Sequence, residues 1–363
     1  MSKIDLIVFY NLAFLRKKQN IFEVKMNLLL ADIGGTNARF GFKKNDDDKE
    51  ITNITYLKCS DFTNIHQAIN HYKQSNNLDI DSMSLAVAST TKNDSIKFTN
   101  NNWDFKQTEL FKFFNLKKIL FINDFVAQAL CFSSFYTNLT EDKNINKDLS
   151  IKNNLKVIRQ GTPILKAPLL VTGPGTGLGV CTLFLSEQNP IAIEGEGGHV
   201  TFAPNSDLEI KLLLFLRKKY DHISMERIVS GSGIEEIYNF ILNQKGLKPS
   251  NLKAPEIGKE ALLGEENALK SVKIMFGILG TIVSNIILIN GTQSGVIISG
   301  GITPKLQSIL EISDFEKNLL NKGRRCDYIK NVPIWLTEDN NNGLIGALNA
   351  YKNPHYEYKI ISK

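Results

Sequence analysis

The stretch from Asn27 to Phe42 reads NLLLADIGGTNARFGF and is the most informative in the chain. Its beginning, Asn27 to Ala31, is a nearly continuous apolar run, which is typical of a buried strand. Two adjacent glycines within Asp32 to Asn37 indicate a tight turn, and Arg39 to Phe42 resumes a strand-like pattern. The stretch therefore predicts a strand, a glycine turn and a second strand.

A similar arrangement returns in the middle of the chain. Ala167 to Val171 is apolar, Thr172 to Gly179 is rich in glycine, and Val180 to Leu185 is again strand-like. A repeated strand-turn-strand unit indicates two related halves. We therefore predict an α/β protein built from two α/β domains.

The predicted domains have the following bounds. Residues 1–26 form an N-terminal extension, residues 27–136 with 340–363 a small α/β domain, and residues 137–339 a large α/β domain. The segment 138–154 is rich in Asn, Lys and Asp and is predicted to be a solvated loop near the boundary. Periodicity predicts helices, the last of which should return to the first domain, at Asp207–Tyr220, Gly233–Asn243, Glu260–Ile289 and Gly343–Tyr351. Buried strands are predicted at Gly295–Ser299 and Val332–Leu336.

Composition argues against several classes of protein. The chain has 363 residues, 42% hydrophobic and 22% charged, which is typical of a globular protein large enough for two cores. Its 43 basic and 37 acidic residues are spread out, without the dense basic block that a nucleic-acid-binding face needs. Four widely spaced cysteines indicate neither a disulfide framework nor a zinc site, so we expect a reducing, cytoplasmic location.

Two apolar segments could in principle be a targeting signal or a membrane span. In residues 1–26 the basic residues at 16–18 follow the apolar run, which is the reverse of a signal peptide. A dispensable extension or misassigned start, a targeting signal and a docking arm all stay open for this segment. Ile274 to Ile289 is shorter than the ~20 residues that cross a bilayer, so a buried helix is predicted there, and no membrane partner.

The first glycine turn, Asp32-Ile33-Gly34-Gly35-Thr36-Asn37, has the chemistry of a phosphate loop. Its glycines let main-chain N–H groups approach an anion, while Thr36 and Asn37 add side-chain donors. Asp32, at the end of the strand, is suited to hold a hydrated Mg²⁺ that bridges phosphate oxygens. A glycine hairpin with a capping aspartate would give the same pattern.

The second glycine turn reads Gly173-Pro174-Gly175-Thr176-Gly177-Leu178-Gly179. It lacks the ending of a Walker A loop and the spacing of a dinucleotide fingerprint, and a strand follows it where both of those folds need a helix. Two glycine hairpins from related halves can grip a triphosphate from both sides. We therefore expect contacts to a triphosphate from Gly173, Gly175, Thr176 and Gly177.

A third glycine element, Gly300-Gly301, follows a predicted strand and precedes Thr303-Pro304. Thr303 is a predicted helix N-cap and Pro304 a predicted first helical residue. Without side chains, Gly300 and Gly301 would let a flat adenine ring lie against the backbone, although a packing requirement explains them nearly as well.

Asn123-Asp124 stands between an apolar strand, Ile119 to Ile122, and a helical pattern that begins at Val126. A carboxylate at a strand end can accept the proton of an attacking hydroxyl, and the Asn123 amide can donate to and accept from sugar hydroxyls. The same pair is also the ordinary pattern of a helix N-cap.

The segment Glu194 to His199 concentrates acids, glycines and a histidine in a predicted loop. Carboxylates such as that of Glu196 accept hydrogen bonds from vicinal hydroxyls, and Glu226 offers another acceptor unless it is a solvated helix residue. His199 with Glu196 could alternatively hold zinc. Since no second histidine is near and no cysteine lies between positions 181 and 326, we predict no tight transition-metal site.

Taken together, these motifs resemble the bacterial-type glucokinase family of the actin-like sugar kinases, in both order and spacing. The resemblance runs from about Leu28 to Ala350, and the long matches at Gly173–Val180 and Gly195–Asn205 are its most specific part. The related repressor and kinase (ROK) family carries a cysteine-rich zinc motif after its Gly-His segment, and this chain has none there. Ala88–Thr91 stands where the family usually has a Pro-containing turn.

The resemblance implies two RNase H-like domains around a cleft and an ATP-dependent glucose kinase. It implies that Asp124 takes the proton from glucose O6 and that Asn123 holds neighbouring hydroxyls. Glu196, His199 and Glu226 match positions that bind the hydroxyls at the anomeric end. The turn at 31–36 matches the main ATP loop, with Mg²⁺ arriving as MgATP, and a homodimer is common in the family.

Two other classes of function share this fold. A glucose-sensing regulator would bind sugar without turnover and would usually carry an added helix-turn-helix, for which residues 1–26 are too short. An actin-like filament ATPase would have no use for the acid-rich loop around Glu196.

Overall fold

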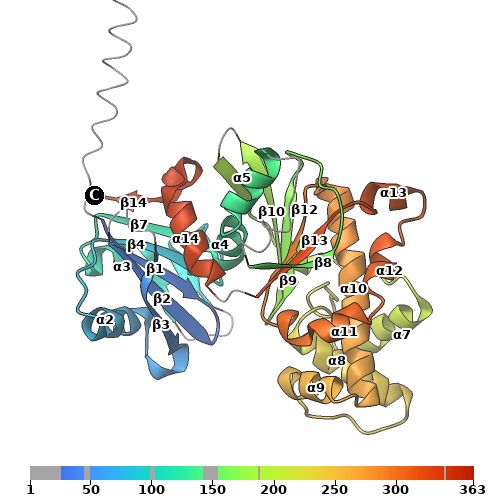
Figure 1. Ribbon diagram of the computed structural model, residues 1–363. Coiled ribbons are helices and arrows are strands. Elements are labelled where there is room, and N and C mark those ends of the chain that lie inside the picture. The colour runs from blue at the N-terminus through green and yellow to red at the C-terminus, as the bar shows by residue number, and fades with distance from the viewer. Residues whose placement is uncertain (1–25, 45–49, 99–102, 142–153, 187–188, 339–340) are drawn as a thin grey trace, which may run out of the picture. The chain divides into compact units, whose positions relative to one another are not determined.

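The computed structural model describes residues 26–44, 50–98, 103–141, 154–186, 189–338 and 341–363 (Figure 1). Packing divides the chain into two compact units. The first contains the described residues up to Phe121 together with Lys359–Lys363, and the second runs from Ile122 to Tyr358. The N-terminal extension and most of the predicted 138–154 loop lie outside the described residues, although a helix, α5 (Ser133–Glu141), covers the first four positions of that loop.

The first unit is built on a six-stranded sheet with the order β14-β7-β4-β1-β2-β3. Its central strand β1 pairs antiparallel with β2 and parallel with β4, and β2 pairs antiparallel with β3. The two predicted strands of the opening stretch are thus confirmed as β1 and β2. The bounds are β1 Asn27–Ile33, β2 Asn37–Lys44, β3 Thr52–Lys58, β4 Ser82–Val87, β7 Lys118–Asn123 and β14 Ile361–Ser362.

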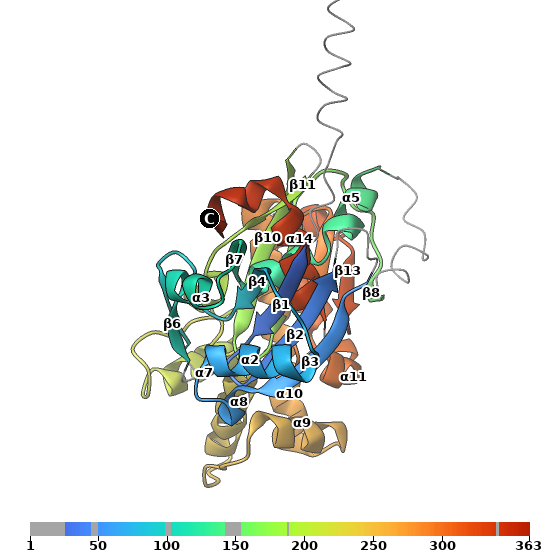
Figure 2. The same cartoon turned by 90° about the vertical axis from the view of Figure 1, so that its left-hand side faces the viewer.

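Two helices, α2 (Ile65–Ser75) and α3 (Gln107–Phe113), lie on one side of this sheet (Figure 2). Asn64 starts α2, because its side chain accepts a hydrogen bond from the main-chain nitrogen of Gln67 over 2.9 Å. The buried face of α2 reaches the sheet through Tyr72, whose ring stacks on Phe40 of β2. A short hairpin, β5 (Ser95–Lys97) with β6 (Asp104–Lys106), and the turn η1 (Cys59–Asp61) complete the unit.

The second unit repeats the arrangement of the first. Its sheet has the order β11-β10-β9-β12-β13-β8, and β9 pairs antiparallel with β10 and parallel with β12. The predicted repeat of a strand, a glycine turn and a strand is therefore confirmed as β9 and β10. The bounds are β8 Leu155–Arg159, β9 Leu169–Pro174, β10 Leu178–Ser186, β11 Asn189–Ile193, β12 Gly295–Ile298 and β13 Ile334–Thr337.

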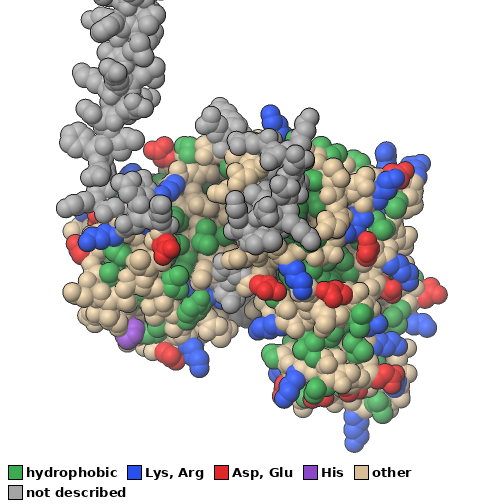
Figure 3. Space-filling model, in the orientation of Figure 1, with side chains coloured by type: hydrophobic (Ala, Val, Ile, Leu, Met, Phe, Trp, Pro, Cys, Tyr) green, Lys and Arg blue, Asp and Glu red, His purple; other side chains and the backbone are tan. Residues whose placement is uncertain are grey.

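Helices surround this second sheet. Besides α5, the α-helices of the second unit are α4 Asp124–Leu130, α7 Asp207–Leu216, α8 Gly231–Gln244, α9 Ala254–Leu262, α10 Glu266–Asn290, α11 Gln307–Glu311, α12 Phe315–Leu320, α13 Cys326–Ile329 and α14 Asn342–Lys352. The 3-10 turns are η2 Gly197–His199, η3 Pro304–Leu306, η4 Gly323–Arg325 and η5 Pro354–Lys359. On the face in Figure 3, basic and acidic side chains of the described residues are interspersed.

The longest helix, α10, is the core helix that the apolar run at 274–289 predicts. Its buried residues share one apolar core with Leu170 of β9 and Val296 of β12. By length and composition it could cross a membrane, but most of its apolar stretch is already buried inside the second unit.

The prediction of one continuous helix from Glu260 to Ile289 is wrong. The chain breaks between α9 and α10 at Gly264, where φ is +89°, a conformation that glycine adopts without strain. Glu265 then caps α10, since its carboxylate accepts from the main-chain nitrogens of Asn267 and Ala268. Helical periodicity runs on across this break, which is why the pattern alone misses it.

The final helix α14 packs closely on α4. A methyl group added at Gly346 of α14 would lie 1.6 Å from the carbonyl oxygen of Ala127, so only glycine allows this approach. Asn349 also donates a hydrogen bond to the carbonyl oxygen of Leu130 over 2.8 Å. The compact units place both helices in the second unit, whereas the predicted domain bounds place both in the first. Those domain bounds stay a prediction.

Candidate active site

Asn123 and Asp124 form the corner between β7 and α4. The Oδ1 atom of Asn123 accepts hydrogen bonds from the main-chain nitrogens of Phe125 (2.9 Å) and Val126 (3.2 Å), so Asn123 is the N-cap of α4. Asp124 is the first residue of the helix, is partly exposed, and accepts at Oδ1 from the nitrogen of Phe125. Asn123 is therefore an N-cap, which was the ordinary interpretation of the pair. The Asp124 carboxylate follows directly after β7, at the strand end, as the sequence predicts.

The second glycine turn is the tight connection between β9 and β10. The nitrogen of Gly175 donates to the carbonyl oxygen of Gly177 over 2.8 Å, which closes the turn. A methyl group at Gly179 would lie 1.9 Å from the Phe125 ring, because that ring occupies the space where a side chain would stand. The β9–β10 hairpin and the Asn123-Asp124 corner are thus in direct contact within the second unit.

Gly300 and Gly301 lie against the same hairpin. The φ angle of Gly300 is +102°, and a methyl group there would come within 2.6 Å of the carbonyl oxygen of Pro174. The nitrogen of Ile302 donates to that same oxygen over 3.3 Å. Close backbone packing therefore requires glycine at 300, while a methyl group at Gly301 would meet no atom within 4 Å.

The predicted N-cap role of Thr303 is wrong. Its backbone is already helical, with φ −60° and ψ −44°, and its side chain makes no cap hydrogen bond. The Thr303 hydroxyl is buried without a hydrogen-bond partner. Pro304 does begin the first helical turn, η3, as predicted.

Sequence reasoning missed a neighbour of this site, the start of α8. Ser230 caps α8 by accepting a hydrogen bond from the nitrogen of Gly233, and the nitrogen of Gly231 donates to the carbonyl oxygen of Gly175 over 3.0 Å. The helix was predicted to begin at Gly233. A serine three positions before the periodic pattern is an N-cap signal that identifies the true start.

The acid-rich loop also contacts the hairpin, because a methyl group at Gly198 would lie 2.2 Å from the carbonyl oxygen of Leu178. The Nε2 atom of His199 lies 3.9 Å from the nearest carboxylate oxygen of Glu196 and 4.0 Å from that of Glu226. The side chains of Glu196 and His199 are 76% and 60% exposed, which leaves them open to a ligand. The structure therefore brings together the three residues that the sequence assigns to one sugar-binding group.

Glu226 is not a solvated helix residue. Its side chain is 31% exposed, and its Oε2 atom accepts a hydrogen bond from the main-chain nitrogen of Leu178 over 2.9 Å. Its own nitrogen donates to the carbonyl oxygen of Gly198. A methyl group at Gly177 would lie 2.3 Å from Oε2, so the glycine makes room for this carboxylate.

The first glycine turn, in the first unit, spans Gly34 to Thr36. It is closed by a hydrogen bond from the nitrogen of Gly34 to the carbonyl oxygen of Asn37 over 2.9 Å. Asp32, 7% exposed, accepts at Oδ2 from Arg39 Nη1 over 2.9 Å. Burial raises the pKa of the Asp32 carboxyl, and the Arg39 guanidinium opposes this shift.

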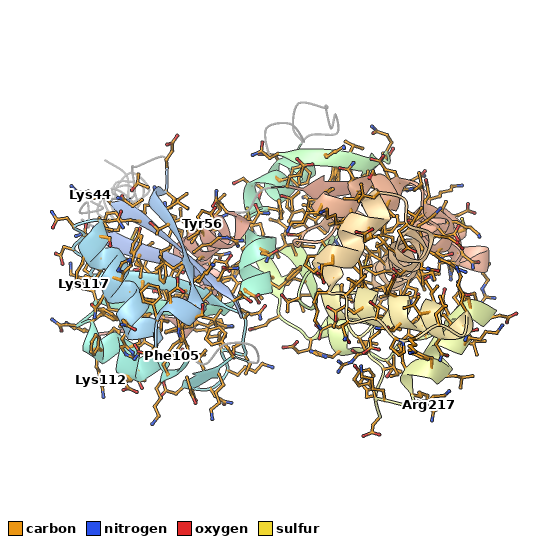
Figure 4. All side chains as sticks on the ribbon, turned by 90° about the horizontal axis from the view of Figure 1, so that it is seen from below. Lys44, Tyr56, Phe105, Lys112, Lys117 and Arg217 are labelled. Carbon is orange, nitrogen blue, oxygen red and sulfur yellow. The ribbon has the colours of Figure 1, made fainter. Side chains whose placement is uncertain are left out.

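Two residues on neighbouring strands, Arg39 and Tyr56, are aligned with Asp32. Asp32 of β1 pairs with Arg39 of β2, which pairs in turn with Tyr56 of β3, and the Arg39 guanidinium lies 5.5 Å from the centre of the Tyr56 ring. Tyr56, which Figure 4 marks in the first unit, is itself 54% exposed. Among the described residues, no group of three His, Cys, Asp or Glu side chains is placed to hold a metal ion. The Asp32 carboxylate, whose Oδ2 already accepts from the guanidinium, fits a hydrated Mg²⁺ that is held through water.

Comparison with known proteins decides the family. The family model described as Glucokinase matches residues 29–354. The glucokinase of Helicobacter pylori strain J99 is 36% identical over 337 residues, which cover 90% of this chain and 95% of the relative. The chain belongs to the glucokinase family.

Solved glucokinase structures agree with this assignment. A glucokinase from an Antarctic psychrotroph superimposes with a TM-score of 0.74 at 31% sequence identity, covering 90% of this chain and 98% of that one. The glucokinase of Balamuthia mandrillaris, solved in complex with glucose, has the same TM-score at 21% identity, covering 90% and 94%, and shows the shared fold. The mixed α/β architecture of this glucokinase-family chain is therefore that of two-domain sugar kinases.

Proposed function

We propose that this chain is an ATP:D-glucose 6-phosphotransferase. It transfers the γ-phosphoryl group of ATP to the 6-hydroxyl of glucose and releases glucose 6-phosphate and ADP, the first step of glycolysis. The observation that carries the proposal is the arrangement around the β9–β10 hairpin in a chain of the glucokinase family. One side of the hairpin contacts the Asn123-Asp124 corner, through Phe125, and another holds Glu226 of the sugar loop.

Asp124 acts as the general base of this reaction. Its carboxylate accepts the proton of the glucose 6-hydroxyl while the bond from O6 to the γ-phosphorus forms and the bond to the ADP oxygen breaks. Asn123 binds neighbouring hydroxyls, and its cap hydrogen bonds keep its side chain fixed. Glu196, His199 and Glu226 bind the hydroxyls near the anomeric carbon, which suits acceptors that are grouped within about 4 Å.

The three glycine elements bind MgATP. Ala31, Asp32, Ile33, Gly34, Gly35 and Thr36 form the main phosphate loop, and Asp32 would hold Mg²⁺ through water. Gly173, Gly175, Thr176 and Gly177 offer main-chain and hydroxyl donors to the phosphates from the second unit. Gly300 and Gly301 flank the adenine, and the free space at Gly301 supports this role. Mg²⁺ supplies charge stabilisation for the transferred phosphoryl group.

The proposal extends to fold detail, location and assembly. Both sheets combine an antiparallel hairpin with a parallel third strand, which supports two RNase H-like domains. We further propose a cytoplasmic enzyme that forms a homodimer and has glucose and MgATP as its partners, with neither nucleic acid nor membrane.

A coupled assay of ADP release tests the function. Purified protein is given glucose, mannose, glucosamine or fructose, with ATP or polyphosphate as donor, with and without Mg²⁺. We expect glucose with MgATP to give the highest kcat/KM, and the product to be glucose 6-phosphate. ATP hydrolysis that is independent of sugar, or glucose binding without turnover, would overturn the proposal.

A further inference from the structure

One side-chain hydrogen bond joins two elements of the second unit that are far apart in sequence. The hydroxyl of Ser299 donates to Oε1 of Gln128 over 2.8 Å, across a sequence separation of 171 residues. Ser299 is 2% exposed and stands directly after β12, while Gln128 lies in α4. Removing Gln128 as a partner would leave the buried Ser299 hydroxyl without this hydrogen bond, which costs free energy.

Ser299 is held firmly by the β9–β10 hairpin. Its nitrogen donates to the carbonyl oxygen of Thr172 over 2.8 Å. A methyl group at Gly173 would lie only 1.4 Å from the Ser299 carbonyl oxygen, so the two backbones are in direct contact. Gly300 is packed on Pro174 in the same way, so the Ser299-Gly300 turn is closely packed on the hairpin along two consecutive residues.

Gln128 lies one helical turn after Asp124 in α4, which puts both side chains on the same face of the helix. The first turn of α4 is attached to the other strand of the hairpin, where the Phe125 ring fills the space beside Gly179, the cross-strand partner of Gly173. The helix is therefore attached to the hairpin body at two points, by the packing of Phe125 and by the hydrogen bond of Gln128.

We propose that Gln128 is a positioning residue for phosphoryl transfer, which fixes the helix that begins with Asp124 to the turn that flanks the nucleotide. This inference rests on the proposed function. The hydrogen bond sets how far the carboxylate of Asp124 stands from the phosphates that the glycine hairpin binds. Reaction rates are sensitive to such placement, since a shift of about 1 Å can cost roughly 100-fold.

The test is a double-mutant cycle with Gln128→Met, Ser299→Ala and the double variant. Both single changes remove the same hydrogen bond and nearly preserve volume. We expect each to lower kcat roughly 3-fold to 10-fold and to raise KM for MgATP, with KM for glucose within about twofold of the unchanged protein. The kcat of the double variant should be no lower than that of the less active single variant, because the bond can be lost only once.

Asn349→Ala is the matched control. Asn349 donates to the Leu130 carbonyl oxygen over 2.8 Å, so this change removes a hydrogen bond from the same helix α4 without touching the Ser299 turn. We expect a lower unfolding midpoint and a kcat within about twofold. The inference would be overturned if the losses of kcat added in the double variant, or if kcat were unchanged in the single variants. It would also be overturned if the Asn349→Ala control were as impaired as Gln128→Met.

Calorimetric titration with ATP keeps the inference testable apart from turnover. Gln128→Met and Ser299→Ala should weaken ATP binding by a similar factor of about threefold or more, again without adding in the double variant. If the protein without substitutions releases no ADP in the presence of glucose, the proposed function fails, whereas the role of Gln128 in ATP binding is not affected by that result. ATP affinities that are equal in all variants would defeat the role of Gln128.

Discussion

Glu226 accepts a hydrogen bond at Oε2 from the main-chain nitrogen of Leu178 over 2.9 Å, across a sequence separation of 48 residues. The carboxylate of Glu226, which is proposed to bind glucose, is thereby hydrogen-bonded to the β9–β10 hairpin, which is proposed to bind ATP. The carboxylate faces His199 with its other oxygen, at 4.0 Å from Nε2. Changes at this carboxylate should therefore affect sugar binding first and the glycine hairpin second.

Replacing Glu226 by Gln should raise KM for glucose about tenfold, with a smaller loss of kcat. The amide keeps an acceptor oxygen but loses the charge that strengthens its hydrogen bonds to hydroxyls and to Leu178. Steady-state kinetics at saturating MgATP measure this. Glu256→Gln is the control, since Glu256 also accepts from a main-chain nitrogen, that of Lys253, but does so at the start of α9. A KM for glucose that does not change would exclude Glu226 from the sugar site.

Replacing Gly177 by Ala should impair both glucose binding and turnover. The added methyl group would stand 2.3 Å from Glu226 Oε2, so the carboxylate must move and give up its bond to Leu178. We expect kcat/KM for glucose to fall on the order of 10-fold to 100-fold. Gly258→Ala in α9, where the methyl group would meet only the Leu306 side chain at 3.4 Å, should retain activity. Equal activity of the two variants would contradict the contact.

Replacing Asp124 by Asn should leave a folded protein that binds glucose and turns over slowly. Loss of a general base typically costs 10²-fold to 10⁴-fold, and we expect kcat to fall within about that range. Calorimetry should give a Kd for glucose within a few-fold of the unchanged protein. Turnover near the original rate would show that another group takes the proton.

Replacing Arg39 by Gln should destabilise the first unit more at neutral pH than in mild acid. Burial already raises the pKa of Asp32, and loss of the opposing guanidinium raises it further. With a folded-state pKa above that of the unfolded chain, protonation stabilises the fold, so the loss shrinks as pH falls toward the raised pKa. We expect the free energy of unfolding to fall by about 1–3 kcal/mol at pH 7 and by less at pH 5.

The control for Arg39 is Lys117→Gln. Lys117 is 63% exposed and pairs with Asp81 over 2.9 Å, so its loss should change stability little at either pH. Denaturant unfolding at the two pH values measures both variants. A loss in Arg39→Gln that is the same at pH 5 and pH 7 would show that Asp32 does not depend on the guanidinium for its charge.

Local sequence determined the strands, the turns and the chemistry of the motifs. The glycine turns after β1 and β9 and the cap at Asn123 each depend on residues within a few positions, so sequence patterns predict them. The helix from Glu260 to Ile289 and the cap at Thr303 were wrong for a related reason. In both places the outcome depends on backbone conformation, which the residue pattern does not reveal: the positive φ of Gly264 ends the helix, and Thr303 is already helical.

Tertiary structure alone decided which motifs meet within the second unit. The contacts of Glu226 with Leu178, of Phe125 with Gly179 and of Gln128 with Ser299 join residues that are 48 to 171 positions apart. Such contacts depend on how strands and helices pack, because a side chain's neighbours in space are set by the whole sheet and not by its neighbours in sequence. The sequence therefore determined the kinds of groups at the site, and packing around the β9–β10 hairpin determined which of them act on one another.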